Sequence, residues 1–412
     1  MVRVNSRQII LYMVIFAIAI SLFSVGQVLQ PALTLPASKD AFLSVVDYDK
    51  QKNCTADLDK RPTSIEYLTH FNCGKVSQGE NGQTIREFTL IIEENQNVTI
   101  SNAGHYFDAW TFNGTVPGPT MRMTEGDLVK INVINSKDSK HTHSLHTHSI
   151  HTAEMDGVAV PISSNSQGQL HEVADNNNNM NSTVEDVYES GMILPGKSFT
   201  YEFVAQPYGV YPYHCLVNPV ADHINSGLYG MMIIDPKEPR EQMVEMVMTM
   251  NGYDMDYDLE GPVMPPSMAE IRGEEEREEE KEREEEKERD NEIYTVNGKA
   301  FDYMDNPIPL NVGEKNRIYL LNMVEFDLIN SFHLHGDMIS YIPGGTQYES
   351  TQVNDVIELG QANRGIVEFE YDNPGRYMFH AHVQEFTDLG WMGLFDVKQE
   401  NATSAGTESI NL

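Results

Sequence analysis

The chain has 412 residues, of which 40% are hydrophobic, and its formal net charge is −34 at pH 7. This length exceeds one ordinary domain and predicts two or three, and the apolar fraction is sufficient for packed cores. The strong negative charge opposes binding to nucleic acid and to anionic membranes, so we expect no nucleic-acid partner.

The N-terminus predicts export. Arg3 and Arg7 precede an uncharged, mostly apolar run from Ile9 to Val25, which is the layout of a secretory signal or of a single membrane anchor. We assign residues 1–40 to this segment and 41–83 to an N-terminal extension. Either alternative places the working domains at the outer face of the cytoplasmic membrane, in the periplasm or outside the cell. Cys54 and Cys73 could pair there and leave Cys215 unpaired.

Short segments with alternating apolar residues follow, separated by turn signals such as Asn113-Gly114 and Pro195-Gly196. Regular short strands with such punctuation favour β-sandwiches, and we predict two, over residues 84–236 and 293–398. The expected strands are Glu87 to Ile92, Asn97 to Ser101, Leu128 to Val133, Phe199 to Phe203, Gly230 to Ile234, Tyr294 to Asn297, Asn316 to Leu321, Gly365 to Tyr371 and Gly393 to Val397.

Three further segments are expected to lie outside these sandwiches. Residues 163–185 are polar and predict a surface loop. Residues 237–292 predict a linker, because Glu274 to Asp290 contains only Glu, Arg, Lys and Asp and cannot build a core. Residues 399–412 form a tail. Within the linker, Met246, Met248 and Met250 alternate as one face of a strand would, which favours core packing over metal binding.

Nine of the 14 histidines fall into four short clusters that predict a copper protein. Two histidines with one cysteine form the usual ligand set of a blue, type 1 copper, and His143, Cys215 and His223 can supply it. Leu228 lies five residues beyond His223, where many such sites place a methionine, and a non-coordinating leucine should raise the reduction potential. The other histidines are His146, His148, His214, His333, His335, His380 and His382.

Several sequence segments make the chain resemble the two-domain multicopper oxidases that keep a blue copper only in the first domain, a family related to copper nitrite reductases. These segments are Phe112-Asn-Gly-Thr-Val-Pro-Gly-Pro119, Ala153-Glu-Met-Asp-Gly157, Ser226-Gly-Leu-Tyr-Gly230, Tyr377-Met-Phe-His-Ala-His382 and Leu389-Gly-Trp-Met-Gly393. The resemblance covers about residues 84–398 and implies an all-β fold of two cupredoxin-like Greek-key β-sandwich domains.

The resemblance also implies a copper cluster shared between neighbouring subunits of a homotrimer. His146 and His333 would bind a type 2 copper, and the type 3 pair would use a set of five histidines: His148, His214, His335, His380 and His382. An eighth histidine is missing, because Leu216 stands where the family has the second histidine of His-Cys-His. Asp156 resembles the acidic residue that delivers protons for the reduction of O2 to water, and an ordinary surface aspartate in an Asp-Gly turn is the alternative.

Two other functions remain open at this point. A copper nitrite reductase needs one type 2 copper with three histidines, which His148, His214 and His382 would supply, and Leu216 favours that alternative. Against it, His146 stands where the catalytic aspartate of those enzymes is expected, and His333 and His380 would be idle. A non-enzymatic electron carrier or copper-binding protein would need only the blue site. The electron donor, whether a small molecule, a metal ion or a redox protein, is not indicated by the sequence.

Overall fold

The computed structural model describes residue 54 and residues 62–102, 104–158, 191–255 and 290–399. The predicted signal or anchor, the polar loop 163–185, the charged run except Asp290, and the tail except Gln399 lie outside the described residues. Within the described part, no helix is both long and apolar enough to cross a bilayer. All described residues belong to one compact unit that spans residues 48–412.

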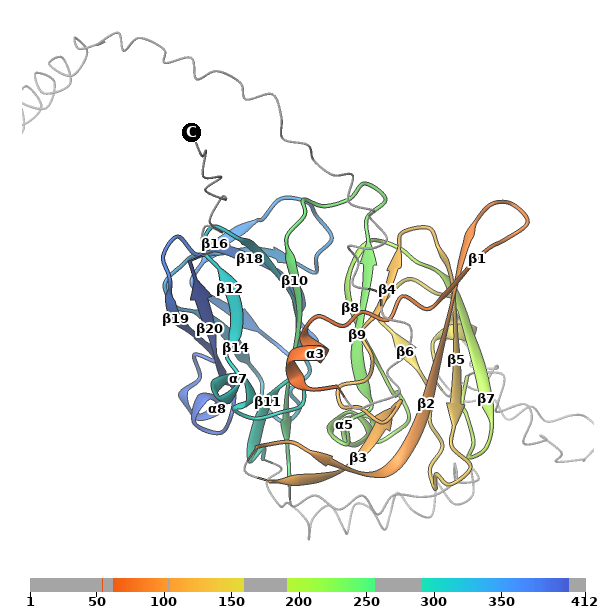
Figure 1. Cartoon of the computed structure of the whole chain (residues 1–412). Helices are drawn as coiled ribbons and strands as arrows, with labels where there is room; N and C mark the ends of the chain where they lie inside the picture. The colour runs from red at the N-terminus through yellow and green to blue at the C-terminus, as the bar shows by residue number, and fades with distance from the viewer. Residues whose placement is uncertain (1–53, 55–61, 103, 159–190, 256–289, 400–412) are drawn as a thin grey trace, which may run out of the picture. The chain divides into compact units, whose positions relative to one another are not determined.

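The first sandwich consists of two sheets (Figure 1). One has the order β1-β2-β5-β7, with β3 also paired to β2, and the other has the order β4-β9-β8-β6. The strands are β1 (Lys75–Gln78), β2 (Thr84–Thr99), β3 (Tyr106–Phe112), β4 (Met121–Thr124), β5 (Leu128–Asn135), β6 (His146–Thr147), β7 (Ser198–Val204), β8 (Gly209–His214) and β9 (Tyr229–Asp235).

Alternation along the strands fills the interior of this sandwich. Every second residue of β2 from Phe88 to Ile92 is buried, and β5 does the same from Val129 to Val133. Because successive side chains of a strand point to opposite faces, these residues form one inward face. They pack with Tyr213 and Cys215 in a single apolar core, so the side chain of the free cysteine belongs to that core.

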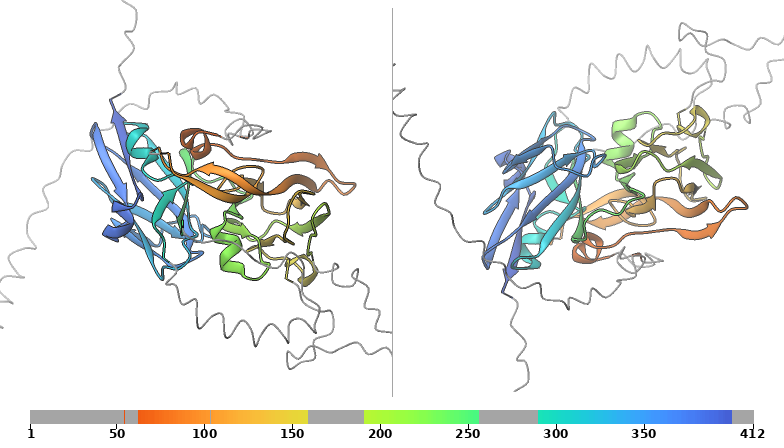
Figure 2. Two further views of the ribbon diagram at one scale, coloured as in Figure 1. Left: turned by 90° about the horizontal axis from the view of Figure 1, so that it is seen from below. Right: turned by 90° about the horizontal axis from the view of Figure 1, so that it is seen from above.

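The second sandwich also has two sheets, β11-β10-β13-β18-β15-β16 and β12-β20-β19-β14-β17. Its strands are β10 (Val244–Tyr253), β11 (Ile293–Val296), β12 (Ile308–Asn311), β13 (Lys315–Asn322), β14 (Asn330–Leu334), β15 (Ile339–Pro343), β16 (Gln352–Asn354), β17 (Val356–Leu359), β18 (Arg364–Glu370), β19 (Gly375–His380) and β20 (Met392–Lys398). The mostly cyan and blue strands of this sandwich can be followed from two further directions in Figure 2.

Strand β10 lies within the stretch 237–292, where a linker was expected, yet it pairs with β11 and β13 of the second sandwich. In Figure 1 it is the green strand among cyan and blue ones. Met246, Met248 and Met250 point into the core of that sandwich, as their alternation predicts. Linker composition therefore begins only after this strand.

A third apolar core joins the sandwiches, because Val247 on the opposite face of β10 packs with residues of β8, β9 and β13. A buried ion network lies beside it. Arg122 of β4 forms a two-point contact with Asp235 of β9 at 2.8 and 2.9 Å and reaches Glu245 of β10 at 2.6 Å. Burial alone would raise the pKa of Glu245, but Arg122 lowers it below the ordinary value of 4.5.

Short helices complete the fold: α3 (Ser64–Leu68), the 3-10 helix η1 (Ala153–Met155), α5 (Val220–Asn225), α7 (Asp302–Asp305) and α8 (Gln384–Asp388). Helix α3 begins with a capping box in which the Thr63 hydroxyl accepts from the backbone N–H of Glu66. The Cys54–Cys73 disulfide, possible from the cysteine count, closes the N-terminal extension onto itself, and Cys215 is a free, buried cysteine. The described residues thus form the predicted all-β architecture.

Candidate metal centre

His143, Cys215 and His223 come together at one end of the first sandwich. Cys215 directly follows β8, His223 belongs to α5, and His143 is fixed by two backbone hydrogen bonds with Ile193, of 3.1 and 2.7 Å. The Nδ1 atoms of His143 and His223 lie 3.7 and 3.1 Å from the Cys215 sulfur. All three side chains are buried, so the sequence-predicted set forms a compact His2Cys group.

The electrostatics of this group favour a thiolate. Burial alone would raise the pKa of Cys215, but His223 and His143 beside the sulfur hold it well below its ordinary value. The backbone N–H of Ser144 also donates to the sulfur at 3.4 Å. Leu228 is fully buried nearby, and its carbonyl accepts from the backbone N–H of Cys215 at 3.0 Å. The leucine side chain offers no metal-binding atom.

Glu94, which was not predicted as a site residue, lies against this group. Its carboxylate is 2.9 Å from His143 Nε2 and 3.1 Å from His141 Nδ1. Burial alone would raise the pKa of Glu94, but these contacts and the backbone N–H groups of Lys140 and His141 hold it well below its usual range. The sequence offers one signal for its role: Glu94 is a charged residue at a position where the alternation of β2 places a buried side chain.

His146, His148 and His214 form a second group in the first sandwich. β6 pairs with β8 so that His146 lies opposite His214, and the Nε2 atoms of His148 and His214 are 3.1 Å apart. His214 Nδ1 lies 2.8 Å from its neighbouring carbonyl, that of Cys215. A carbonyl only accepts, so Nδ1 carries the proton and Nε2 has the free lone pair. This is the form in which imidazole binds a metal.

Burial, with the neighbouring histidines, lowers the pKa of His148 to about 3, and burial also lowers that of His214. Both rings are therefore neutral at pH 7 and can bind a cation without first losing a proton. Two neutral nitrogens 3.1 Å apart can both bind the same cation.

The second sandwich carries a matching group of His333, His335 and His380. β14 pairs with β19 so that His333 lies opposite His380, and the Nε2 atoms of His335 and His380 are 3.0 Å apart. His333 Nδ1 lies 2.8 Å from the carbonyl of Asp355, and His380 Nδ1 lies 2.6 Å from that of Ala381. These rings again present Nε2. Burial lowers the pKa of His335 and of His380.

His382 is not part of that compact group. Its ring is 5.3 Å from the ring of His333, and both His382 and His335 are exposed to solvent. Gly336 follows His335 with φ +81°, and a Cβ there would lie 2.5 Å from the Tyr377 ring. Position 336, two residues after the end of β14, therefore requires glycine, which lets the chain turn against the Tyr377 ring directly after His335.

Asp156 lies at the rim of the first histidine group. Its carboxylate oxygen is 3.0 Å from His146 Nδ1 and 3.6 Å from His151 Nε2. Gly157 fixes this position, because it has φ +75° and a Cβ there would lie 2.3 Å from the carbonyl of Leu145. The imidazole of His151 thus lies within ion-pair distance of Asp156, and that of His141 lies within hydrogen-bond distance of Glu94.

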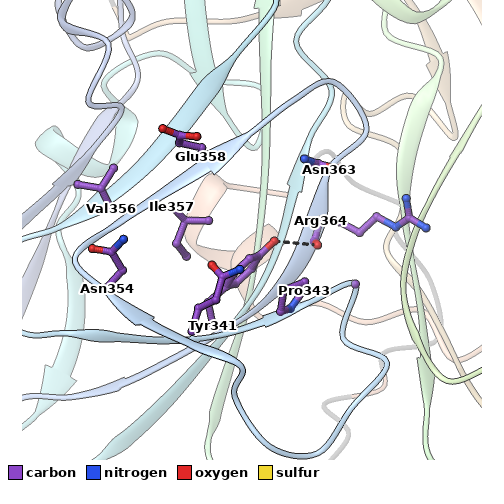
Figure 3. A pocket seen from close by; sticks show the side chains of 10 residues that line it. Tyr341, Pro343, Asn354, Val356, Ile357, Glu358, Asn363 and Arg364 are labelled. Carbon is purple, nitrogen blue, oxygen red and sulfur yellow. Dashed lines mark hydrogen bonds between the residues drawn. The ribbon is translucent and has the colours of Figure 1, made fainter.

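Among the described residues, no group of candidate ligands combines histidines of the two sandwiches. A separate open cavity of about 640 Å³ lies in the second sandwich, where Tyr341 donates to the carbonyl of Arg364 at 3.0 Å (Figure 3). Its lining includes neither histidine nor cysteine, so it is distinct from the candidate metal centre.

Comparison with known proteins identifies the family. Two family models described as multicopper oxidase match residues 94–171 with 169–239, and residues 266–401. A crystal structure of a multicopper oxidase is 36% identical, covers 83% of this chain and 100% of its own, and superposes with a TM-score of 0.65. The chain belongs to the multicopper oxidase family. Multicopper oxidases are copper-dependent oxidoreductases, so the predicted family and cofactor class are confirmed.

Nitrite reductases are more distant relatives of this multicopper oxidase. A copper-containing nitrite reductase of Neisseria gonorrhoeae is 27% identical over 281 residues, which are 66% of this chain and 58% of that protein. The match thus spans less than two thirds of that relative. A copper nitrite reductase structure from Nitrosomonas europaea is 22% identical, covers 76% of this chain and 94% of its own, and has a TM-score of 0.55. These neighbours confirm the cupredoxin-like Greek-key fold.

Proposed function

We propose that the protein is an exported multicopper oxidase that takes electrons at a type 1 copper held by His143, Cys215 and His223 and reduces O2 to water at a copper cluster between subunits. The observation that carries this proposal is that six of the remaining histidines form two similar groups of three, one group in each sandwich. Each group contains one facing Nε2 pair and one further histidine.

The donor atoms fit copper. A thiolate with two imidazoles suits a blue copper, and imidazole nitrogens with preset tautomers suit type 2 and type 3 copper. When bound, copper supplies the one-electron redox chemistry that these side chains lack. His214 and Cys215 are adjacent in the chain, and the 2.8 Å contact between them shortens the path further. The polypeptide thus provides a direct covalent connection between the two sites.

Each sandwich offers an incomplete ligand set, which supports a cluster shared between subunits, and the resemblance to the family implies that the assembly is a homotrimer. His382 of a neighbouring subunit would complete the His148 and His214 pair, and exposed His335 and His382 are accessible to a neighbour. Head-to-tail contacts of this kind close into a ring. A histidine at position 216 would then be the third ligand of the copper held by His335 and His380. Because leucine cannot bind metal, this copper would have only two histidine ligands.

Asp156 is proposed as the proton donor during reduction of O2. Its carboxylate contacts His146 and His151 and is about one third exposed, so it can exchange protons with solvent. A carboxylate in this position can also orient the His146 ring, which would leave Nε2 for the type 2 copper.

Reduction of nitrite to NO at a single type 2 copper is the second candidate function. Leu216 favours it, because the remaining complete set would be His148 and His214 with His382 of a neighbour. His335 would then be the acid–base group near the substrate, because His335-Gly336-Asp337 resembles the segment that carries the catalytic histidine of those enzymes. The similarity to nitrite reductases supports this alternative, whereas the retained His146, His333 and His380 favour the oxidase.

Export is supported by the Cys54–Cys73 disulfide, since disulfides form and persist outside the cytoplasm. We propose a location at the outer face of the membrane, in the periplasm or outside the cell. The electron donor is left open between a small molecule, a metal ion and a redox protein, and the acidic surface favours cationic donors.

Metal analysis of the full chain, followed by O2 and nitrite assays on the same sample, tests the proposal. About four coppers per subunit, or about three if the pair beside Leu216 lacks one copper, with O2 consumption support the oxidase. About two with release of NO support the reductase, and about one with neither activity supports an electron carrier. His148→Asn should abolish either activity while the blue colour remains. Lys137→Gln, an exposed site outside the histidine groups, is the matched control.

A further inference from the structure

A charged side chain occupies an inward position of β2 where apolar residues are expected. Phe88, Leu90 and Ile92 point into the core, and Glu94 is the next residue on the same face. Only 1% of its side chain is exposed. The register of β2 against β3 shifts between Glu93 and Gln96, so Glu94 lies within a local irregularity of the strand pairing. Burial of an unpaired carboxylate would be strongly destabilising, so its partners must account for it.

Four donors surround the carboxylate. Oε1 accepts from His143 Nε2 and from the backbone N–H of His141, both at 2.9 Å. Oε2 accepts from the backbone N–H of Lys140 at 2.9 Å and from His141 Nδ1 at 3.1 Å. Since Nε2 of His143 carries the proton, its Nδ1 lone pair faces the Cys215 sulfur.

The Trp110 indole packs against three of the histidine rings around Glu94 and Cys215. Its ring centroid lies 4.6 Å from that of His141, 5.2 Å from that of His143 and 4.9 Å from that of His223. The two histidines of the type 1 set and the outer His141 therefore pack around one indole. This packing, with the contact between His143 Nε2 and Glu94, favours the ring orientation in which Nδ1 faces the sulfur.

We propose that Glu94 is a positioning residue of the type 1 site, which fixes the tautomer and orientation of His143 and lowers the reduction potential of the bound copper. A negative charge one imidazole away stabilises Cu(II) more than Cu(I), and a carboxylate that accepts from a ligand histidine makes that ligand more basic. Glu94 thus opposes the upward effect of Leu228. The inference rests on the type 1 site of the proposed function.

Glu94→Gln tests this proposal in the copper-loaded full-length protein by redox titration with visible and EPR spectra. Glutamine preserves the shape but removes the charge, so the balance should move about tenfold toward Cu(I), which corresponds to ~59 mV upward. Glu93→Gln, on the same strand and only half-buried, is the matched control and should leave the potential unchanged. Glu94→Asp retains the charge and should shift the potential less than Glu94→Gln does.

A second variant acts in the opposite direction. His141→Phe keeps an aromatic ring against Trp110 but removes one donor to Glu94, so more negative charge acts on His143 and the potential should fall. The proposal is overturned if Glu94→Gln leaves the potential unchanged or lowers it, or, should that variant not fold, if His141→Phe leaves it unchanged or raises it. A wild-type protein without a type 1 spectrum would instead refute the proposed function itself.

Discussion

The replacement Leu216→His tests whether one missing imidazole limits the copper cluster. The backbone of residue 216 is held in place, because its N–H donates to the Ser144 hydroxyl at 3.2 Å. Leu216 is half-buried, so exchange for a polar ring should cost about 1 kcal/mol of unfolding free energy in the copper-free protein. With copper at a hundredfold excess over its dissociation constant, a newly completed site should restore about 2.7 kcal/mol.

The assay combines copper analysis, near-ultraviolet absorption and urea unfolding with and without copper. We expect about one additional copper per subunit and the appearance of the near-ultraviolet band of an oxidised type 3 pair. Leu216→Gln is the matched control, since it has the same polarity change without an imidazole. The reasoning is wrong if both variants bind the same amount of copper and have the same spectra.

Three further predictions concern proton delivery, the buried ion network and the disulfide. Asp156→Asn should lower turnover by about a hundredfold or more, with normal copper content and blue colour, in steady-state assays of O2 uptake; full activity would exclude the proton-delivery role. Glu245→Gln should destabilise the fold by about 1–3 kcal/mol at pH 7 because Arg122 loses one of its partners. The pKa of Glu245 in the folded protein is depressed below its ordinary value of 4.5, so this contribution is present above pH 4.5 and lost as the pH falls through the depressed pKa. Urea unfolding against pH should show the difference between variant and wild type shrinking there, and a pH-independent difference would contradict the assignment. Replacing Cys54 and Cys73 with serine should cost about 3 kcal/mol by the loop-closure relation for 19 residues, measured by thermal unfolding, whereas an unchanged melting temperature would show that the disulfide does not constrain the chain.

Local sequence was enough to specify the residue types of the candidate centre and most of the strand pattern. Imidazole and thiolate chemistry is encoded locally, so the order His-x-His and His-Cys predicts copper ligands without coordinates. Alternation with a period of two likewise predicted inward faces such as that of Met246, Met248 and Met250. The missing histidine at Leu216 is also a local fact, although its consequence for the cluster remains a prediction.

Which groups meet depends on the tertiary fold. His148 faces His214 across 66 residues of sequence because β6 and β8 pair, and β10 joins the second sandwich although its surroundings have linker composition. Glu94 reaches His143 across 49 residues because β2 lies beside the loop that carries the ligand. Such distances depend on strand pairing and core packing between distant segments, and no local pattern of residues specifies them.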